Sequence, residues 1–295
     1  MANTRDIRRR IKSIKNTAQI TKAMQMVAAS KMRKAQQAAL TGRPYAELLN
    51  KMMRSTAARA NINAHPLIEP REVKKVGVLV ISTNRGLCGA LNTNLLRTIA
   101  NYETAKTAFV SAGTKGRSFL ARTKRELLAD FEVTDAFSFS DARAIGRFLV
   151  ETFIEKKVDR VDVLYTNFVN TLTQKPEQVQ LLPISPNVAL QVSLDDVDQQ
   201  AAAETKEGEA ADYEYEPDAG EVLGAILPHY VNFAVWHYLL ESKASEHSAR
   251  MVAMKNATDN ALQLVKDLTL EYNKIRQASI TKELLEIATA QMALG

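Results

Sequence analysis

The chain has 295 residues, of which 46% are hydrophobic and 24% charged, and it carries a net charge of +6. A single cysteine, Cys88, excludes an internal disulfide framework and fits a reducing compartment. The sequence has no run of 18 apolar residues and no apolar core in its first residues, so we expect neither a membrane span nor a secretory signal peptide.

Charge is distributed unevenly along the chain. Residues 1–60 carry fourteen Lys and Arg against two acidic side chains, which makes a local net charge of +12. Residues 195–221 carry eleven acidic side chains against one Lys, which makes a local net charge of −10. This polarisation indicates charged partners.

The first forty residues predict a long helix with a coiled-coil seam. Residues suited to a seam recur at alternating steps of four and three, which is the heptad period. The seam consists of Ile7, Ile11, Ile14, Ala18, Thr21, Gln25, Ala28, Met32, Ala35 and Ala39. Its small members let two helices approach closely but bury little, since each missing methylene forgoes about 0.8 kcal/mol. Ile20, Met24 and Val27 form a second stripe off the seam, so we expect this helix to meet more than one partner surface.

The region 41–190 predicts a break and then an α/β domain. Gly42 and Pro44 predict a kink or an interruption of the helix, which resumes at 45–60 before a linker at 61–70. Strands are predicted at 73–81, 107–111, 158–165 and 178–182, and helices at 91–102, 114–122 and 141–156. Strands that alternate with helices favour a parallel sheet.

The last hundred residues predict an acidic loop followed by one very long helix. Residues 195–211 are acidic, rich in Ala and Gln and poor in large apolar side chains, which predicts a mobile loop. Asp218 is a suitable cap, Pro228 falls in the early turns, and no further proline follows. About 65 helical residues would span about 100 Å. The end of this helix, 284–294, is apolar or small on most faces, so we expect other subunits to enclose it in a hydrophobic sleeve.

The glycine-bearing turn at 82–90 allows two interpretations. It follows a strand, which suggests nucleotide binding, but Gly86 and Gly89 match neither the dinucleotide fingerprint nor a Walker phosphate loop. A tight strand-to-helix turn is the favoured interpretation. Cys88 has no base nearby in the sequence and is expected to be a partly buried small hydrophobe. The histidines at positions 229, 237 and 247 do not share a helical metal-binding face, and we expect them on the helix surface.

The basic N-terminal helix also leaves alternatives open. A nucleic-acid partner, a solvated helix face and an acidic protein partner are all compatible with its charge. Residues 1–44 contain no aromatic side chain for base stacking, and the seam overlaps the basic face. An acidic protein surface is therefore favoured over nucleic acid.

Several long stretches resemble the gamma subunit of F-type rotary ATP synthases. The run from Ile7 to Ala35 is the most specific, and the others follow in order along almost the whole chain. They are Gly86–Gly89 with Leu91 and Asn92, Tyr213–Asp218, Leu240–Met251 and Tyr272–Ile287.

The resemblance implies a fold class and a role. The expected fold is α/β: a long antiparallel coiled coil of the N- and C-terminal helices plus a central Rossmann-like domain with a mainly parallel sheet. The implied domains are 1–60, 70–220 and 221–295. The implied role is the central rotor shaft that couples proton flow through a membrane ring to ATP synthesis or hydrolysis. A basic coiled-coil adaptor or a nucleic-acid-binding protein is the alternative.

The resemblance also implies partners and a location. One copy would sit among three alpha and three beta subunits and would contact the epsilon subunit and the membrane c-ring. It would lie peripherally at the cytoplasmic face of a bacterial inner membrane. No catalytic residue, cofactor, metal or nucleic acid is expected.

Three groups of contact residues follow from the resemblance alone. Those expected to contact a beta subunit are Lys22, Met24, Arg276, Gln277 and Thr281. Those expected in the sleeve are Leu284, Leu285, Ile287, Met292 and Leu294. Tyr213 and Glu216 are expected to form a foot on the membrane ring.

Overall fold

The structure is a computed structural model that describes residues 4–59, 65–184 and 215–294. The side chains of residues 43, 54, 57–59, 293 and 294 lie outside this described part. The chain divides into two compact units, residues 1–28 with 250–295 (the helix-pair unit) and residues 29–249 (the α/β unit). The predicted acidic loop at 195–211 lies outside the described residues. The predicted domains, 1–60, 70–220 and 221–295, assign each long helix to one domain, and these boundaries stay a prediction.

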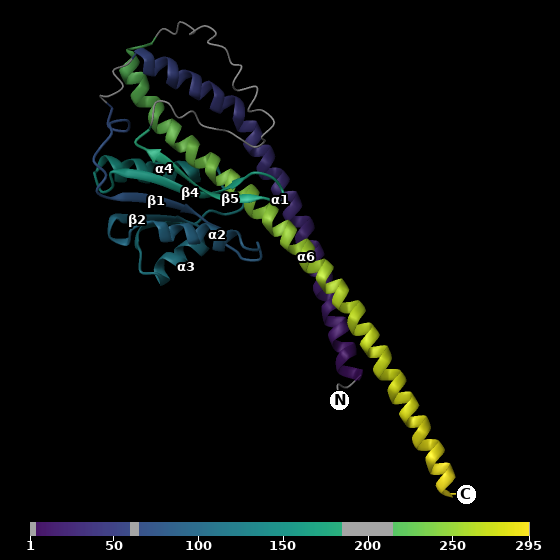
Figure 1. Ribbon diagram of the computed structural model, residues 1–295. Coiled ribbons are helices and arrows are strands. Elements are labelled where there is room, and N and C mark those ends of the chain that lie inside the picture. Colours follow the sequence, from purple (N-terminus) through teal and green to yellow (C-terminus); the bar gives the residue numbers. More distant parts are fainter. Residues whose placement is uncertain (1–3, 60–64, 185–214, 295) are drawn as a thin grey trace. The chain divides into compact units, whose positions relative to one another are not determined.

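Two long helices begin and end the chain (Figure 1). Helix α1 covers Thr4–Arg59 and is not interrupted at Gly42 or Pro44. Helix α6 covers Ala219–Leu294, a length of 76 residues that exceeds the prediction. Asp218 caps α6 as expected, because its Oδ1 accepts the backbone N–H groups of Gly220 at 2.6 Å and Glu221 at 2.9 Å.

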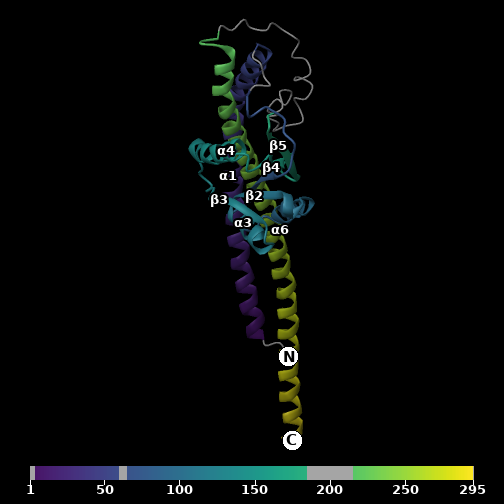
Figure 2. The same cartoon turned by 90° about the vertical axis from the view of Figure 1, so that its left-hand side faces the viewer.

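In the helix-pair unit, the start of α1 lies beside the second half of α6 (Figure 2). The hydroxyls of Thr21 and Thr258 are hydrogen-bonded at 2.7 Å, and the Arg8 guanidinium donates to the Tyr272 hydroxyl at 2.5 Å. A lower number in α1 pairs with a higher number in α6, so the two helices are antiparallel. All ten predicted seam positions of α1 are buried or half-buried, which confirms the predicted heptad seam.

The α/β unit contains a five-stranded sheet in the order β3-β2-β1-β4-β5. The strands are β1 (Val76–Ile81), β2 (Thr107–Ala112), β3 (Glu126–Phe131), β4 (Arg160–Phe168) and β5 (Gln174–Leu182). Four strands are parallel, and only β5 pairs antiparallel, with β4. The mainly parallel sheet confirms the predicted fold class. The chain moves from β1 outward to β3 and then crosses to β4 on the other side of β1, so the order reverses between β1 and β4.

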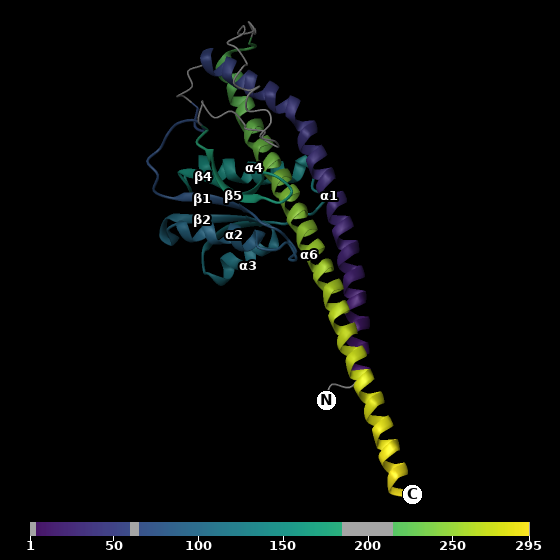
Figure 3. The same ribbon diagram turned by 45° about the vertical axis from the view of Figure 1, so that its right-hand side comes forward.

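Alternation along the central strand sends side chains to two separate cores. Val78 and Val80 pack with helices α2 (Leu91–Thr98) and α3 (Thr114–Arg122) on one face. Leu79 and Ile81 pack with α4 (Phe139–Ile154), α1 and the early part of α6 on the other face. Figure 3 shows α2 and α3 on one side of this sheet and α4 on the other. Two short 3-10 helices, Ile99–Asn101 and Thr104–Lys106, join α2 to β2. The sheet is therefore covered on both faces, as a parallel sheet requires.

The strand β3 is not among the predicted strands. Its sequence, Glu-Leu-Leu-Ala-Asp-Phe, has no β-branched residue and carries an acid at its first and fifth positions. Such an edge strand is specified by pairing with β2 rather than by its own propensity. The helix α4, by contrast, has a local start signal, because the Asp141 carboxylate accepts the Ser138 backbone N–H at 2.8 Å.

Candidate functional site

The helix-pair unit presents a surface of α1 that its seam does not use. Lys22 is exposed, and Ile20 and Val27 have exposed fractions of 61% and 55%. Met24 is half-buried. Ile20 and Val27 lie outside the seam, on one side of it, and Met24 lies at its border. Lys22 lies on the other side of the seam, because residues two positions apart do not face each other on a helix. The exposed surface of α1 therefore carries apolar side chains on one side of the seam and a positive charge on the other, which suits an acidic partner that also carries apolar groups.

The end of α6 is uncovered within the described part of the chain. Every residue from Arg276 through Met292 is exposed. Arg276, Gln277 and Thr281 lie on this stretch, and the Thr281 hydroxyl donates to the backbone oxygen of Gln277 at 3.0 Å. The hydroxyl is thus satisfied inside the helix, while the side chains of Arg276 and Gln277 face solvent.

Apolar side chains dominate the last turns of α6. Leu284, Leu285 and Ile287 are exposed by about 60% each, and Met292 by 84%. The side chain of Leu294 lies outside the described residues. Contiguous exposed apolar residues of this size mark an interaction surface. Their enclosure in a sleeve of other subunits stays a prediction.

The predicted foot is only partly described. Glu216 is exposed, next to the start of α6, whereas Tyr213 lies outside the described residues. The neighbouring Tyr215 is half-buried, and its hydroxyl donates to the Ser55 hydroxyl at 3.1 Å. This bond joins the end of α1 to the segment before α6 inside the α/β unit.

The polar turn after β1 is used to hold the α/β unit together. Ser82 Oγ accepts the Gly116 backbone N–H at 2.7 Å, and Thr83 Oγ1 accepts from the Asn92 amide at 2.7 Å. Asn84 donates to the Val133 carbonyl at 2.7 Å and accepts the Thr114 N–H at 3.1 Å. These groups stand at the carboxyl end of β1, where an α/β sheet usually binds its ligand. Here they bind the chain itself, which agrees with the structural interpretation of the turn.

Helix α6 packs against the same edge of the sheet. The Ser245 hydroxyl donates to the Thr166 carbonyl at 3.0 Å, and the Ser248 hydroxyl donates to the Thr171 carbonyl at 2.8 Å. Both acceptors lie at or just beyond the carboxyl end of β4. Cys88 accepts from the Asn92 amide at 3.3 Å and is buried, more fully than the sequence predicts.

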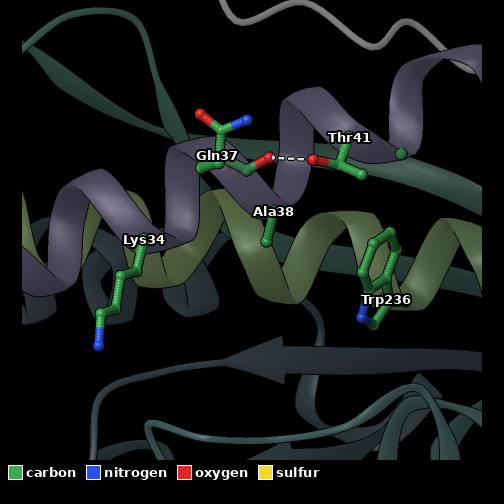
Figure 4. A pocket seen from close by; sticks show the side chains of 6 residues that line it. Lys34, Gln37, Ala38, Thr41 and Trp236 are labelled. Carbon is green, nitrogen blue, oxygen red and sulfur yellow. Dashed lines mark hydrogen bonds between the residues drawn. The ribbon is translucent and has the colours of Figure 1, made fainter.

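One open hollow of about 480 Å³ lies on the α/β unit between α1 and α6 (Figure 4). Its lining residues are Lys34, Gln37, Ala38, Thr41, Gly42 and Trp236. The Thr41 hydroxyl donates to the Gln37 backbone oxygen at 2.8 Å, and the Lys34 chain extends away from Trp236. The hollow brings together no pair of acid and base groups, so its residues offer no catalytic constellation.

The histidine prediction is wrong for two residues. His229 is exposed as expected, but the side chains of His237 and His247 are only 2% and 4% exposed. His237 Nε2 lies 3.1 Å from Glu241 Oε1, one helical turn away. Their burial comes from the packing of α6 against the sheet, which a helix-periodicity argument could not detect.

Burial, in one case with nearby carboxylates, raises the pKa of two tyrosines, Tyr165 and Tyr230. Burial, and then the charges of Glu241 and Glu177, raise the pKa of Tyr165 far above its ordinary range. Burial raises the pKa of Tyr230 to about 12. Both phenols therefore stay protonated at neutral pH and serve as neutral hydrogen-bonding groups. Within residues 4–59, 65–184 and 215–294, no three His, Cys, Asp or Glu side chains are grouped as metal ligands would be.

The exposed α1 surface and the uncovered helix end define a class of protein. A coiled-coil pair that leaves large apolar side chains exposed, joined in sequence to a well-packed α/β unit, is typical of a subunit of a larger assembly. No helix in the described part is long and apolar enough to cross a membrane.

Comparisons with known proteins identify the family. The family model described as ATP synthase matches residues 3–294. The ATP synthase gamma chain of Methylacidiphilum infernorum (isolate V4) is 50% identical over 300 residues, covering 100% of both chains. The gamma chain of Opitutus terrae is 49% identical and covers 99% of each. This chain belongs to the ATP synthase gamma chain family.

A solved structure agrees with the fold. The rotor of the Euglena gracilis mitochondrial ATP synthase matches with a TM-score of 0.61 at 20% identity, covering 94% of this chain and 98% of that chain. At this identity the match concerns the fold, and the family assignment depends on the sequence matches.

Proposed function

We propose that this chain is the central rotor shaft of an F-type ATP synthase. The observation that carries the proposal is the full-length match to gamma chains at about half identity, together with the uncovered apolar end of α6. A shaft that turns inside other subunits needs surfaces that remain exposed when the chain is alone. In this role it couples rotation of a membrane ring to ATP synthesis or hydrolysis on neighbouring subunits.

The α1 surface on both sides of the seam, around Ile20, Lys22 and Met24, is the proposed contact with the acidic lever loop of a beta subunit. Lys22 supplies charge, and Met24 with the exposed Ile20 supplies apolar contact. Exposed ion pairs are worth only about 0–1 kcal/mol each, so such contacts can be exchanged between successive beta subunits at little cost. One asymmetric shaft would then contact three similar subunits differently and shift each toward a different state.

The end of α6 supplies the other proposed contacts. Arg276, Gln277 and Thr281 would hydrogen-bond a second loop of beta. The apolar side chains Leu284, Leu285, Ile287, Met292 and Leu294 would turn inside a sleeve formed by alpha and beta subunits. Apolar contact suits a bearing, because it is non-directional and favours no single angle.

The other end of the complex is proposed to meet the membrane ring. Glu216 and Tyr213 would contact polar loops of the c-ring, and the α/β unit would contact the epsilon subunit. The chain would then be present once per complex with three alpha and three beta subunits. It would lie peripherally, on the cytoplasmic face of the bacterial inner membrane.

We propose that this chain catalyses no reaction by itself. The polar groups at the carboxyl edge of the sheet are occupied by hydrogen bonds within the α/β unit. Catalysis would belong to the partner subunits, and this chain would change their affinity and rate by mechanical contact.

Reconstitution tests the proposal. The purified chain is mixed with alpha and beta subunits of the same source, and the complex is isolated by gel filtration and assayed for ATP hydrolysis. We expect one stable ATPase complex that contains this chain. Failure of the chain to join the complex would contradict the proposal, and salt-sensitive binding of the free chain to DNA or RNA at physiological salt would favour the nucleic-acid alternative.

A further inference from the structure

Two lysines and a histidine from two helices surround one carboxylate in the α/β unit. Asp135 lies in the loop between β3 and α4. Its Oδ2 is 2.5 Å from Lys31 Nζ of α1, and its Oδ1 is 3.4 Å from Lys243 Nζ and 3.9 Å from His247 Nε2 of α6. A single loop carboxylate thus bridges both long helices to the domain that carries the sheet.

The α6 side of this cluster is buried. The side chains of Lys243, Glu246 and His247 are 8%, 5% and 4% exposed, and Lys243 also donates to Glu246 at 3.1 Å. Buried charges are tolerated only when they are paired and hydrogen-bonded, so Lys243 needs its carboxylate partners. Asp135 and Lys31 are each 42% exposed and close the cluster toward solvent.

Asp135 stays ionised in this setting. Burial by itself raises its pKa, but the hydrogen bond from Lys31 and the charges of Lys243, His247 and Lys31 outweigh burial and lower the pKa to about 2. The Asp135 carboxylate is therefore ionised throughout the physiological pH range.

The surrounding contacts of α1 and α6 with the domain are apolar packing and neutral hydrogen bonds. Phe137 packs near Ala39, Leu240 and Ala244, and these contacts are apolar and non-directional. The links from Ser245 and Ser248 to the sheet are neutral hydrogen bonds from α6 alone. Charge-assisted bonds are roughly twice as strong as neutral ones, and in this cluster they reach both helices from one side chain.

We propose that Asp135 is a positioning residue that holds α1 and α6 at one fixed position on the α/β domain, residues 65–184. Torque applied to the domain is then passed to both helices. When the Asp135 contacts are lost, the domain rotates without turning the helices through the full angle. This inference rests on the proposed function as a rotor shaft, and it identifies the contact through which torque passes from the domain to the helices.

The test uses the complete ATP synthase reassembled in sealed vesicles. Asp135→Asn preserves the size of the side chain and removes its charge. We expect ATP hydrolysis to stay within twofold of the unmodified complex, while protons pumped per ATP fall several-fold. Asp135→Glu retains the carboxylate and should restore much of the pumping ratio.

Asp130→Asn is the matched control. Asp130 also forms an ion pair, with Arg117 at 3.1 Å, but this pair joins β3 to α3 within the domain. We expect its pumping ratio to remain normal. An Asp135→Asn complex that pumps as well as the Asp130→Asn complex would overturn the proposal.

A second pair of variants covers the case in which Asp135→Asn does not assemble. Lys31→Met removes only the half-exposed arm from α1, and Lys34→Met is its control on the exposed surface one turn away. Lys31→Met should lower the pumping ratio and Lys34→Met should not. Equal ratios in these two would overturn the proposal. A failure of the unmodified chain to reconstitute any ATPase would instead contradict the proposed function, so the two outcomes are distinguishable.

Discussion

The helix-pair unit and the α/β unit are built on opposite principles. In the helix-pair unit the buried apolar side chains are Ile7, Ala18, Ala28, Met254 and Val265. More large apolar side chains are exposed there than buried, including Ile20, Leu270, Leu284 and Met292. The α/β unit has two apolar cores, one on each face of its sheet. The comparison teaches that the α/β unit stabilises the chain, whereas the helix-pair unit keeps its surface for partners.

The largest difference should appear between a core leucine and a leucine at the end of α6. Leu79 is fully buried in β1, so Leu79→Ala should lower the free energy of unfolding by about 2–5 kcal/mol. Leu285→Ala at the exposed end of α6 should change it by less than about 0.5 kcal/mol. Urea unfolding of the isolated chain measures both, and similar losses in the two variants would break the comparison.

The next largest effect concerns backbone freedom in the α/β unit. Gly113 has φ +117°, and an added Cβ would lie 2.2 Å from the Ser82 carbonyl oxygen. Gly113→Ala should therefore cost about 2–4 kcal/mol through strain and overpacking. Gly86, which has no atom within 4 Å of an added Cβ, is the control. Chemical denaturation of Gly113→Ala and Gly86→Ala would show whether the close approach of Gly113, just after β2, to the turn after β1 matters for stability.

The helix-pair unit should show its effect in the assembled complex instead. Arg276→Ala or Gln277→Ala should leave the thermal unfolding of the isolated chain unchanged, because both side chains are exposed. In the reconstituted complex each should lower ATP hydrolysis several-fold, since a contact with the partner is lost. Turnover equal to that of the unmodified complex would count against the proposed role of these residues.

A smaller effect is expected inside the seam. Thr258→Val keeps the shape of the side chain but removes its hydrogen bond with Thr21, which retains a bond to the Ala18 carbonyl at 3.1 Å. The loss should be about 1 kcal/mol or less. Amide hydrogen exchange should quicken in residues 4–28 and 250–276 and stay constant in the sheet. Faster exchange in the sheet as well would show that the two units are not energetically separate.

The smallest effect is a pH dependence confined to strong acid. The depressed pKa of Asp135, about 2, means that its stabilising contribution is complete above the ordinary carboxyl pKa near 4. The contribution is lost as the pH falls from about 4 through about 2. The melting temperature of the unmodified chain should thus fall more steeply over this range than that of Asp135→Asn. If the melting temperatures of the two proteins fall in parallel over this pH range, the ion cluster around Asp135 does not contribute to stability.

Much of the fold could be read from local periodicity. The heptad steps from Ile7 to Ala39 predicted the seam, and four of the five strands were predicted from the local sequence. The absence of proline after Pro228 predicted most of α6. These features depend on neighbours within a few residues, so the sequence itself contains the necessary information. The contact residues came from the family resemblance, and they remain predictions until partners are present.

What the tertiary structure decided depends on residues far apart in the chain. The strand β3 forms because β2 offers it an edge, and His237 and His247 are buried because α6 packs on a sheet formed about a hundred residues earlier. The cluster around Asp135 joins positions 31, 135, 243 and 247, and no local pattern links them. Local propensity acts over one or two helical turns, whereas burial and ion pairing are properties of the folded packing. By itself, then, the sequence determined the long paired helices and the family, and only the folded chain decided how the helices are joined to the domain.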